Sequence, residues 1–461
     1  MLQEHNVSDG TDNIDSQIPE LDGTEIIVDM TGKGGPDINY KRGIAGPGMK
    51  GFFYSGQMCC FLSDLKDGGF GIFNGIRSLA KDPTTNPSYP YGEFYFDEAS
   101  KTFGTRQVEE FTSIRKYTAD LGFEVISQIG GTAEYAGFQT DSRYTWNSPD
   151  FAPLPSPEYM SEFQRCFTEF AIEADQAVAP DFHSIWIGTQ EITHTIGYPG
   201  GVQTQQSKEE AIDRFIDYWK PISDALRATG ARTGGLQLNS DNALYGLYEY
   251  AARKMIEKEL HVDFLTYQFY QWGTPSGMEK AVEALEIYRK KYPETQIIID
   301  RGGFEKLIEA DMTESEAFIR FFLTGEKACL DNADKIYAYT LDRAINGFDK
   351  VKGNLEWQSR FWLNGLGNKR RPISDLPSGT DGFFTDKDGN VHGVLWNTGD
   401  KTLDFKLYFK NFSIPKAALR IRKGSNDTIS DVITDWSPSK GMTGKITLAP
   451  YEFLLIEISK Q

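Results

Sequence analysis

The chain has 461 residues, of which 39 % are hydrophobic, 13 % aromatic and 25 % charged, and this composition excludes both a small disulfide-stabilised scaffold and a disordered protein. Its 66 acidic and 48 basic residues give a formal net charge of −18, so the basic balance typical of nucleic-acid-binding proteins is missing and no nucleic acid is expected as a partner. No apolar run approaches the roughly 20 residues of a membrane-spanning helix, so no membrane span is expected.

The beginning of the chain predicts a leader and one strand. Residues 1–21 are polar, acidic and aperiodic, and we interpret them as a flexible leader. In residues 22–49 the apolar run EIIVDM predicts a strand that joins the C-terminal β domain, and a glycine-rich loop follows it. No signal peptide is visible, which predicts a cytoplasmic protein, or a secreted or periplasmic one if the first residues are a trimmed end.

Residues 50–371 alternate short apolar runs with longer amphipathic stretches, which is the pattern of repeated β/α units around a parallel sheet. The apolar runs are, in order, GMKGFFYSG, GIRSLA, FEVISQIG, SIWIGTQE, TGGLQLNS, VDFLTYQFY, TQIIIDRGG and KIYAYTLDR. Eight such units close into a (β/α)8 barrel, and the segment has the length for one. The sequence therefore predicts an α/β fold with a TIM barrel as the catalytic domain.

Residues 372–461 have a different pattern. Short alternating strands are separated by DG, TG, KG and proline, which predicts an accessory antiparallel β-sandwich. Whether this domain binds glycan or only supports the barrel stays open at this point.

The cysteines and histidines indicate neither a disulfide framework nor a metal site. The four cysteines are scattered, and the adjacent Cys59 and Cys60 lie in the apolar setting MCCFL, which is typical of buried free thiols. None of the five histidines has the HxxH or HExxH spacing of a metal site, and no dinucleotide or P-loop motif is present. We therefore expect no metal and no cofactor.

A barrel of this kind carries its active site at the C-terminal ends of its strands. In this chain those ends are rich in carboxylates, amides, aromatic rings and arginines. They are Arg77, Gln190, Glu191, Gln237, Asn239, Gln268, Tyr270, Trp272, Asp300, Arg301, Thr340, Asp342 and Arg343. The mixture is typical of a carbohydrate site, in which aromatic faces stack on sugar rings and fixed polar groups bind hydroxyls.

Two carboxylates are the candidate catalytic pair. Glu191 directly follows an apolar strand and an amide side chain, so it can donate a proton to a glycosidic oxygen, or else cap its loop or pair with an arginine. Asp300 ends the apolar strand IIID and is the best-placed second carboxylate, with a salt bridge to an arginine as the alternative. Glu305, farther along the same loop, is the second choice. A separation of about 5–5.5 Å favours retention and about 6.5–9.5 Å favours inversion.

The remaining polar and aromatic residues are candidate substrate ligands. Arg77, Arg301 and Arg343 end three strands, where they either neutralise the carboxylates or bind the carboxylate or sulfate of an anionic sugar. Tyr270 and Trp272 would stack on sugar rings. The other candidate substrate-binding residues are Gln190, His194, Asn239 and Gln268, and for His194 a packing role in the loop is the alternative.

The order of these segments resembles that of the retaining glycoside hydrolases of clan A, and most closely that of glycoside hydrolase family 39, the β-xylosidases and α-L-iduronidases. The similarity runs from Ile26 to Leu455. GFGIFNGIRSLA matches the second strand with its arginine, WIGTQE the W-x-x-x-N-E acid/base motif, and YPETQIIID leads into the nucleophile strand. The resemblance implies hydrolysis of O-glycosidic bonds in a plant or algal polysaccharide or oligosaccharide, with Glu191 as acid/base and Arg77 supporting the nucleophile.

Three residues depart from the family pattern. Gln190 replaces the asparagine before the acid, and Gln268 stands where a histidine is common. The family's nucleophilic glutamate should fall at or beside Arg301, which is preceded by Asp300. Either Asp300 is the nucleophile (or the base of an inverting enzyme), or another carboxylate acts, or the reaction has been lost. The alternatives to a hydrolase are therefore an inactive carbohydrate-binding barrel and a transglycosylase on the same residues, and the oligomeric state stays open.

Overall fold

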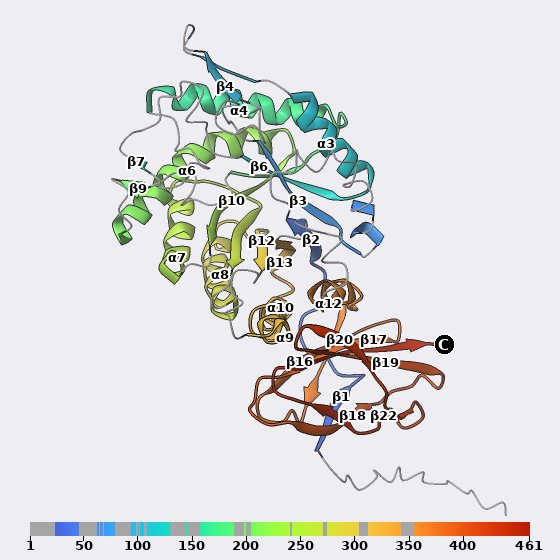
Figure 1. Ribbon diagram of the computed structural model, residues 1–461. Helices are drawn as coiled ribbons and strands as arrows, with labels where there is room; N and C mark the ends of the chain where they lie inside the picture. Colours follow the sequence, from blue (N-terminus) through green and yellow to red (C-terminus); the bar gives the residue numbers. More distant parts are fainter. Residues whose placement is uncertain are drawn as a thin grey trace, which may run out of the picture.

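The computed structural model confirms the predicted fold, a (β/α)8 barrel followed by a β-sandwich (Figure 1). It describes residues 24–45, 62–63, 65–67, 69–78, 94–97, 100, 102–105, 108–129, 144–145, 157–188, 198–199, 204–239, 242–270, 274–303, 312–342 and 355–461.

The barrel is a closed sheet of parallel strands. In the order in which they pair around it, the strands are β2 (Lys41–Ala45), β3 (Ile72–Ser78), β6 (Glu124–Ile129), β8 (Ile185–Ile187), β10 (Arg232–Asn239), β11 (Phe264–Tyr270), β12 (Gln296–Gly303) and β13 (Ile336–Asp342). β13 pairs with β2, and this contact closes the barrel. The segment GMKGFFYSG, expected to form the first barrel strand, lies outside the described residues. In the structure this position is taken by β2, whose sequence KRGIA is too short and too polar to stand out as an apolar run.

Helices follow the strands and cover the outside of the barrel, as a parallel sheet requires. They are α3 (Val108–Asp120), α4 (Pro157–Gln176), α6 (Gln205–Ala228), α7 (Asn242–Glu257), α8 (Thr274–Arg289), α9 (Glu314–Ala317), the π-helix η1 (Phe318–Leu323), α10 (Thr324–Asp331) and α12 (Leu355–Leu363). The short hairpin of β4 (Phe94–Asp97) with β5 (Thr102–Thr105) and the pair β7 (Tyr144–Thr145) with β9 (Tyr198–Pro199) lie outside the barrel sheet.

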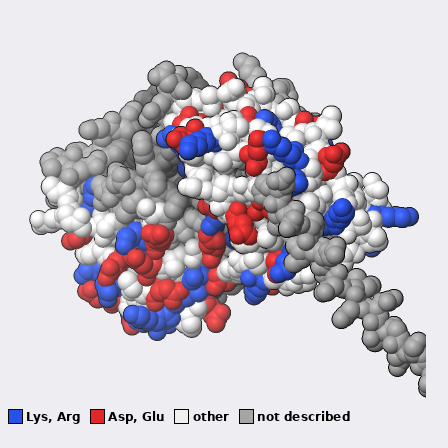
Figure 2. Space-filling model, turned by 90° about the horizontal axis from the view of Figure 1, so that it is seen from below, with Lys and Arg blue, Asp and Glu red and all other residues white. Residues whose placement is uncertain are grey.

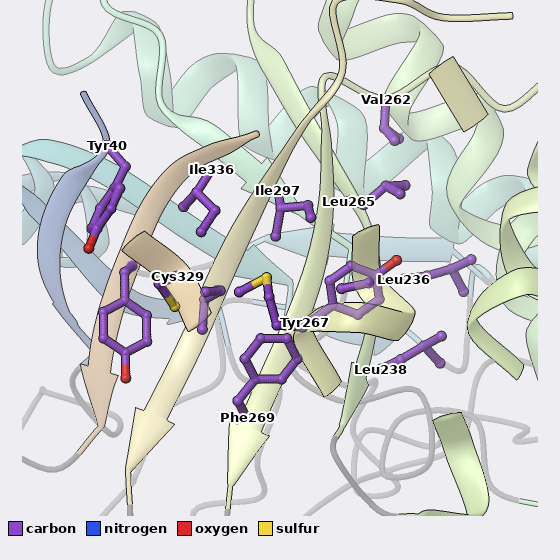
Figure 3. Packing of buried hydrophobic residues seen from close by; sticks show 14 of the residues in the cluster. Tyr40, Leu236, Leu238, Val262, Leu265, Tyr267, Phe269, Ile297, Cys329 and Ile336 are labelled. Atoms are coloured by element: carbon purple, nitrogen blue, oxygen red, sulfur yellow. The ribbon is translucent and has the colours of Figure 1, made fainter. Parts of the chain in front are cut away.

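Successive residues of a strand point to opposite faces of the sheet, so each barrel strand contributes to two cores. The outward residues, such as Leu265, Tyr267 and Ile297, pack under the helices in the larger core (Figure 3). The inward residues form a smaller cluster inside the barrel, whose buried members are Ile72, Ile126, Ile185, Ile187, Phe264, Ile298 and Ala338. The part of the barrel interior that lies toward the N-terminal ends of the strands is therefore filled with apolar side chains.

A cluster of charged residues lies where the barrel strands begin, at the opposite end of the barrel from the predicted active site. The carboxylate of Glu124 accepts hydrogen bonds from Lys41 at 2.5 Å and from the Tyr337 hydroxyl at 2.7 Å, and it pairs with Arg232. Burial alone would raise the pKa of Glu124, but these donors and the two cations lower it below 4.5. The cluster ties together four strands and stays ionised at neutral pH.

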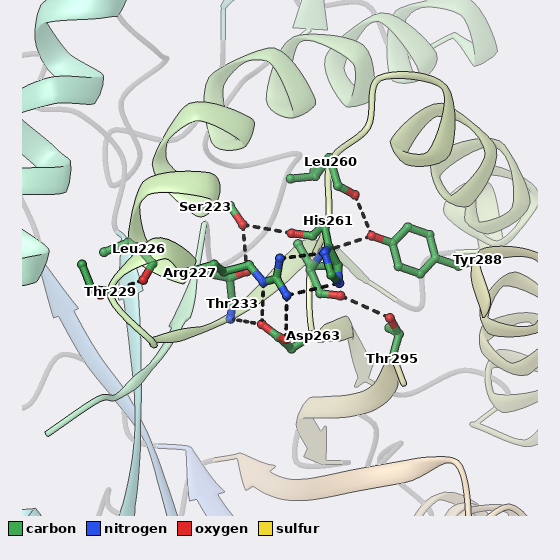
Figure 4. A network of polar contacts seen from close by, with 11 residues as sticks. Ser223, Leu226, Arg227, Thr229, Thr233, Leu260, His261, Asp263, Tyr288 and Thr295 are labelled. Carbon is green, nitrogen blue, oxygen red and sulfur yellow. Dashed lines mark hydrogen bonds and ion pairs between the residues drawn. The ribbon is translucent and has the colours of Figure 1, made fainter. Parts of the chain in front are cut away.

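A second polar network fastens α6 and α8 to the loops that enter β11 and β12 (Figure 4). Arg227 of α6 donates from Nε to the Asp263 carboxylate at 3.1 Å and contacts the ring of His261, and Tyr288 of α8 donates to the Leu260 carbonyl at 2.6 Å. These loops lead into strands, so the network also lies at the end of the barrel opposite the predicted mouth.

The C-terminal domain is a sandwich of two six-stranded sheets. One sheet has the order β15 (Ile373–Ser374), β1 (Thr24–Asp29), β18 (Leu403–Lys410), β22 (Met442–Thr443) and β21 (Trp436–Ser437), with β23 (Ile446–Leu448) also paired to β18. The other has the order β14 (Lys369–Arg371), β16 (Thr380–Lys387), β17 (Asn390–Asn397), β24 (Phe453–Lys460), β19 (Ala417–Ser425) and β20 (Thr428–Val432). β1 pairs in parallel with β18, so the start of the described chain completes the C-terminal domain.

The barrel and the sandwich share one hydrophobic core. Phe453 of β24 is fully buried, and its ring centroid lies 5.1 Å from that of Phe318 in η1. Next to this contact, Arg320 donates to the Tyr451 hydroxyl at 2.7 Å, and the Ser315 amide donates to the Asn426 carbonyl at 2.8 Å. The sandwich thus holds the helices that follow β12, the strand of Asp300.

The surface and the cysteines agree with the composition. On the face in Figure 2, Lys and Arg side chains of the described residues are mixed with Asp and Glu and form no single basic patch. None of the helices in the described residues is long and apolar enough to cross a bilayer. Cys166 and Cys329 are buried free thiols, while Cys59 and Cys60 lie outside the described residues.

Candidate active site

The predicted site residues divide into three groups. Gln190, Glu191, His194, Trp272, Glu305 and Arg343 lie outside the described residues. For Arg77, Asn239, Tyr270 and Arg301 the structure gives the position on β3, β10, β11 and β12 but not the side chain. Asp300 and Gln268 are described in full, and they lie together.

Asp300 is the centre of a polar layer inside the barrel. Its carboxylate is fully buried and accepts a hydrogen bond from Gln128 Nε2 at 2.9 Å on Oδ1 and from Gln268 Nε2 at 3.5 Å on Oδ2. Gln128 is on β6, which lies opposite β12 in the strand order, so the first of these bonds crosses the barrel interior. Ile126 and Ile298, two positions earlier on the same strands, belong to the apolar cluster below.

A β-bulge in β12 gives Asp300 its position. Tyr267 pairs with Ile299, but the next residue of β11, Gln268, pairs with Arg301, so Asp300 is an extra residue. On the other side, Asp300 and Arg301 together oppose the single residue Thr340 of β13. The Thr340 hydroxyl donates to the carbonyl of Asp300 and, at 3.2 Å, to that of Ile299. A bulge changes the direction of a side chain locally, and such features are common next to active sites.

A second bulge, built in the same way, lies in β10. Gly235 pairs with Leu265 and Leu238 with Tyr267, so Leu236 and Gln237 together oppose Thr266. The Thr266 hydroxyl donates to the Gly235 carbonyl. Leu236 has φ +36, a region that non-glycine residues rarely adopt. Strain of this kind persists where the surrounding structure enforces it, and it gathers at functional sites.

β8, the strand before Glu191, is anchored from outside the barrel. Trp186 Nε1 donates to Asp175 Oδ2 at 3.0 Å, and the same carboxylate pairs with the buried Arg115. Gly188 directly follows β8, and a Cβ atom there would lie 2.5 Å from Trp219 Cδ2 and 2.8 Å from Phe215 Cζ of α6. The absence of a side chain at position 188 therefore lets the chain before Glu191 pass close to α6.

The arrangement suits chemistry that needs a fixed carboxylate at the C-terminal end of a barrel. Asp300 receives hydrogen bonds from two uncharged amides of the described residues, and these bonds fix the orientation of its carboxylate. Among the described residues no group of three or more His, Cys, Asp or Glu side chains could hold a metal ion.

Gln128 was not recognised as a site residue from the sequence, and Gln237 was seen only as a strand end. The signal for Gln128 is present in the segment EVISQI, where Glu124, Ile126 and Gln128 share one face of a strand. A polar residue on the same face as an interior isoleucine, near the C-terminal end of a barrel strand, is a candidate for the site. For Gln237 the bulge shifts this alternation, so the side that it faces follows only from the observed pairing.

Comparisons with known proteins support the fold and leave the family open. No protein-family model and no curated protein sequence matches the chain. Solved structures share its fold at 12 % sequence identity, and a similarity at this identity is evidence for the fold only. A family 39 β-xylosidase from Caulobacter crescentus has a TM-score of 0.65, with 94 % of this chain and 99 % of that chain covered. A family 44 xyloglucanase from Paenibacillus polymyxa has a TM-score of 0.57 (95 % and 99 % covered), and a family 30 endoxylanase from Clostridium papyrosolvens one of 0.54 (95 % and 100 % covered).

Proposed function

We propose that the protein is a glycoside hydrolase that cleaves O-glycosidic bonds in a polysaccharide or oligosaccharide, with Glu191 as the acid/base and Asp300 as the nucleophile. The observation that carries the proposal is the carboxylate of Asp300, held by amide donors from β6 and β11 inside the C-terminal part of the barrel. The similarity in fold to xylan- and xyloglucan-degrading enzymes over nearly the whole chain supports the same reaction class. A Glu–Asp pair on two barrel strands would supply the two carboxylates that glycosidic cleavage uses.

The proposal is tested with aryl glycosides and with xylan, xyloglucan, sulfated and uronic-acid-containing polysaccharides. We expect hydrolysis by the wild type, and a loss of roughly 100- to 10,000-fold in kcat for Glu191→Gln, the range assigned to a general acid. Glu158→Gln, in the first turn of α4, is the matched control and should retain wild-type kcat. No hydrolysis of any substrate would reject the proposal.

The role of Asp300 has its own chemical test. Asp300→Asn should lose activity on natural substrates, and added azide should restore cleavage of an activated aryl glycoside and yield a glycosyl azide. If Asp300→Asn stays active while Glu305→Gln is inactive and is rescued by azide, Glu305 is the nucleophile. Retention of configuration in the product of the wild type would support a double displacement, and inversion would assign Asp300 to activation of water.

A carbohydrate-binding barrel without turnover is the second candidate. The specific observation in its favour is that Asp300 is fully buried and hydrogen bonded to two glutamines, as a structural carboxylate would be. Such a protein would bind sugar without releasing product, and Glu191→Gln would leave the affinity nearly unchanged. Product analysis with added acceptor sugars separates hydrolysis from transglycosylation.

A further inference from the structure

Gln237 is a buried polar side chain for which the described part of the chain supplies no hydrogen-bond partner. Its exposed fraction is 0 %, and neither the oxygen nor the nitrogen of its carboxamide makes a hydrogen bond to a residue that the structure describes. A carboxamide can donate two hydrogen bonds and accept two. Buried side-chain amides are nearly always satisfied by protein or ordered water, so an unsatisfied one calls for a missing partner.

The pairing of β10 directs Gln237 to the barrel interior. Its two neighbours, Leu236 and Leu238, belong to the outer core under the helices (Figure 3). A residue between two outward side chains of a strand faces the other side of the sheet. Gly234 also faces the interior, where it lies beside Thr266. Three positions later Gln237 faces the interior again, because the bulge and the positive φ of Leu236 shift the alternation of the strand by one residue.

Gln237 also lies at the level of the catalytic candidate. The strands of a closed barrel are tilted, so residues that pair on neighbouring strands lie at different heights along the barrel axis. From β12 through β11 to β10 the level shifts by about one residue per strand, which leads from Asn239, the partner of Gln268, back to Gln237. The bulges of β10 and β12 are each closed by a threonine hydroxyl from the next strand, Thr266 in one case and Thr340 in the other. The same local device therefore directs one uncharged amide and one carboxylate into the same layer of the barrel.

We propose that the carboxamide of Gln237 binds a hydroxyl of the sugar whose glycosidic bond is cleaved and so determines specificity at that position. The proposal rests on the function proposed above. A sugar hydroxyl both donates and accepts a hydrogen bond, which matches an amide that has both capacities unused. A carboxylate or sulfate can only accept and would leave the amide oxygen without a donor, so the substrate class that Gln237 selects is a sugar with a neutral hydroxyl at that position. A permanently bound water is the competing occupant.

The first experiment combines kinetics with thermal unfolding for Gln237→Met, which keeps an unbranched side chain of similar length and removes the amide. We expect kcat/KM to fall 10- to 100-fold while the unfolding midpoint stays or rises, because no protein hydrogen bond is lost. Gln164→Met is the matched control. Gln164 donates to the carbonyls of Asp217 and Tyr218, so this variant should lower the midpoint and leave the kinetics unchanged.

The second experiment identifies the hydroxyl. Wild type and Gln237→Met are compared on a set of monodeoxy analogues of the aryl glycoside that the wild type cleaves best. One analogue should be a poor substrate for the wild type, and on that analogue the variant should show no additional loss, since the two changes remove one interaction. Wild-type kinetics in Gln237→Met, with a lowered unfolding midpoint, would overturn the proposal and assign the amide to a structural water.

Failure of the proposed function gives a different result. If the wild type cleaves none of the substrates, binding of the same sugars is measured by calorimetry for both proteins. If Gln237→Met binds the sugar 10-fold or more weakly than the wild type, Gln237 is a sugar-binding residue of a barrel that binds without cleaving. No binding by the wild type, or equal binding by both proteins, would reject it.

Discussion

Gln128 and Asp300 meet across the interior of the barrel, with Gln128 Nε2 2.9 Å from Asp300 Oδ1. They come from β6 and β12, and three strands separate these two in either direction around the sheet. Gln268, on the strand beside β12, donates to the other carboxylate oxygen at 3.5 Å. A carboxylate held by donors on two sides keeps one orientation, which is a condition for catalysis by a fixed nucleophile or base.

Gln128→Met tests whether this contact serves the reaction. The variant removes the closer of the two described donors to Asp300 and keeps the length of the side chain. We expect kcat to fall about tenfold or more with a smaller change in KM, because a hydrogen bond to a charged group contributes about 1.5–3 kcal/mol. Steady-state kinetics on the best aryl glycoside measure it.

The control for this variant is Gln205→Met in the exposed first turn of α6, where the amide donates to Glu209. It should leave kcat and KM at the wild-type values. Wild-type kinetics in Gln128→Met would contradict the prediction and would assign Gln128 to stability alone.

Thr340→Val tests the bulge that carries Asp300. Valine keeps the shape of threonine but leaves the buried carbonyls of Ile299 and Asp300 without the hydroxyl donor. We expect the free energy of unfolding to fall by about 1–3 kcal/mol, the range for a buried group that loses its partner, and kcat to fall with it. Denaturant unfolding and kinetics on the same sample measure both.

The matched control is Thr168→Val on α4, whose hydroxyl donates to the carbonyl one turn earlier. It removes the same group far from the layer of Asp300, so kcat should not change. A Thr340→Val variant with the wild-type kcat and stability would show that the bulge forms without this hydroxyl.

The barrel could be predicted from the sequence because its strands are apolar runs with a regular spacing. Seven of the eight expected strand segments overlap β3, β6, β8, β10, β11, β12 and β13. The first barrel strand in the structure, β2, was not found, because a five-residue segment with Lys41 and Arg42 lacks that pattern. The β-sandwich could be predicted from the DG and TG turns between short alternating strands, and in the structure β1 pairs with β18 of one of its sheets.

The layer around Asp300 could be predicted only in part. Asp300 and Gln268 are polar residues at the ends of apolar strands, so the sequence indicates both. The bulges cannot be read from the sequence, because an extra residue is defined by which residues of two strands pair. For that reason neither the contact of Gln128 with Asp300 nor the inward side of Gln237 follows from alternation alone. Glu191 and Glu305 remain proposals.

Gly188→Ala tests the close packing of β8 against α6. The added methyl group would lie within 2.5 Å of Trp219 and 2.8 Å of Phe215, both fully buried, so the strand or the helix must shift. We expect a loss of about 1–3 kcal/mol in the free energy of unfolding, as for other overpacked cores, and a reduced kcat because the displaced chain leads to Glu191. Gly246→Ala in α7, where a Cβ atom meets nothing within 4 Å, is the control and should be neutral or slightly stabilising. Equal stability of the two variants would contradict the prediction.

The network in Figure 4 predicts how the stability depends on pH. Arg227 Nη1 lies 2.7 Å from His261 Nδ1, and the imidazole ring stacks on Tyr292 with the centroids 4.3 Å apart. Burial, and then the charge of Arg227, lower the pKa of His261 below 6.5, against the opposing effect of Asp263 and Asp224. The neutral ring can accept from the guanidinium through one nitrogen, whereas a protonated ring would place two cations in contact.

The pKa of His261 in the folded protein lies below 6.5, the ordinary value for histidine, so the ring takes up a proton more readily in the unfolded chain. Its contribution to stability is therefore complete above about pH 6.5 and is lost as the pH falls through the folded-state value. We expect the unfolding midpoint of the wild type to fall between pH 7 and pH 5, and to fall less in His261→Phe, which keeps the stacking on Tyr292 and does not titrate. His392, whose pKa burial also lowers, gives the comparison: His392→Phe should remove a separate part of the same slope. An unchanged slope in His261→Phe would show that protonation of this ring is not coupled to folding.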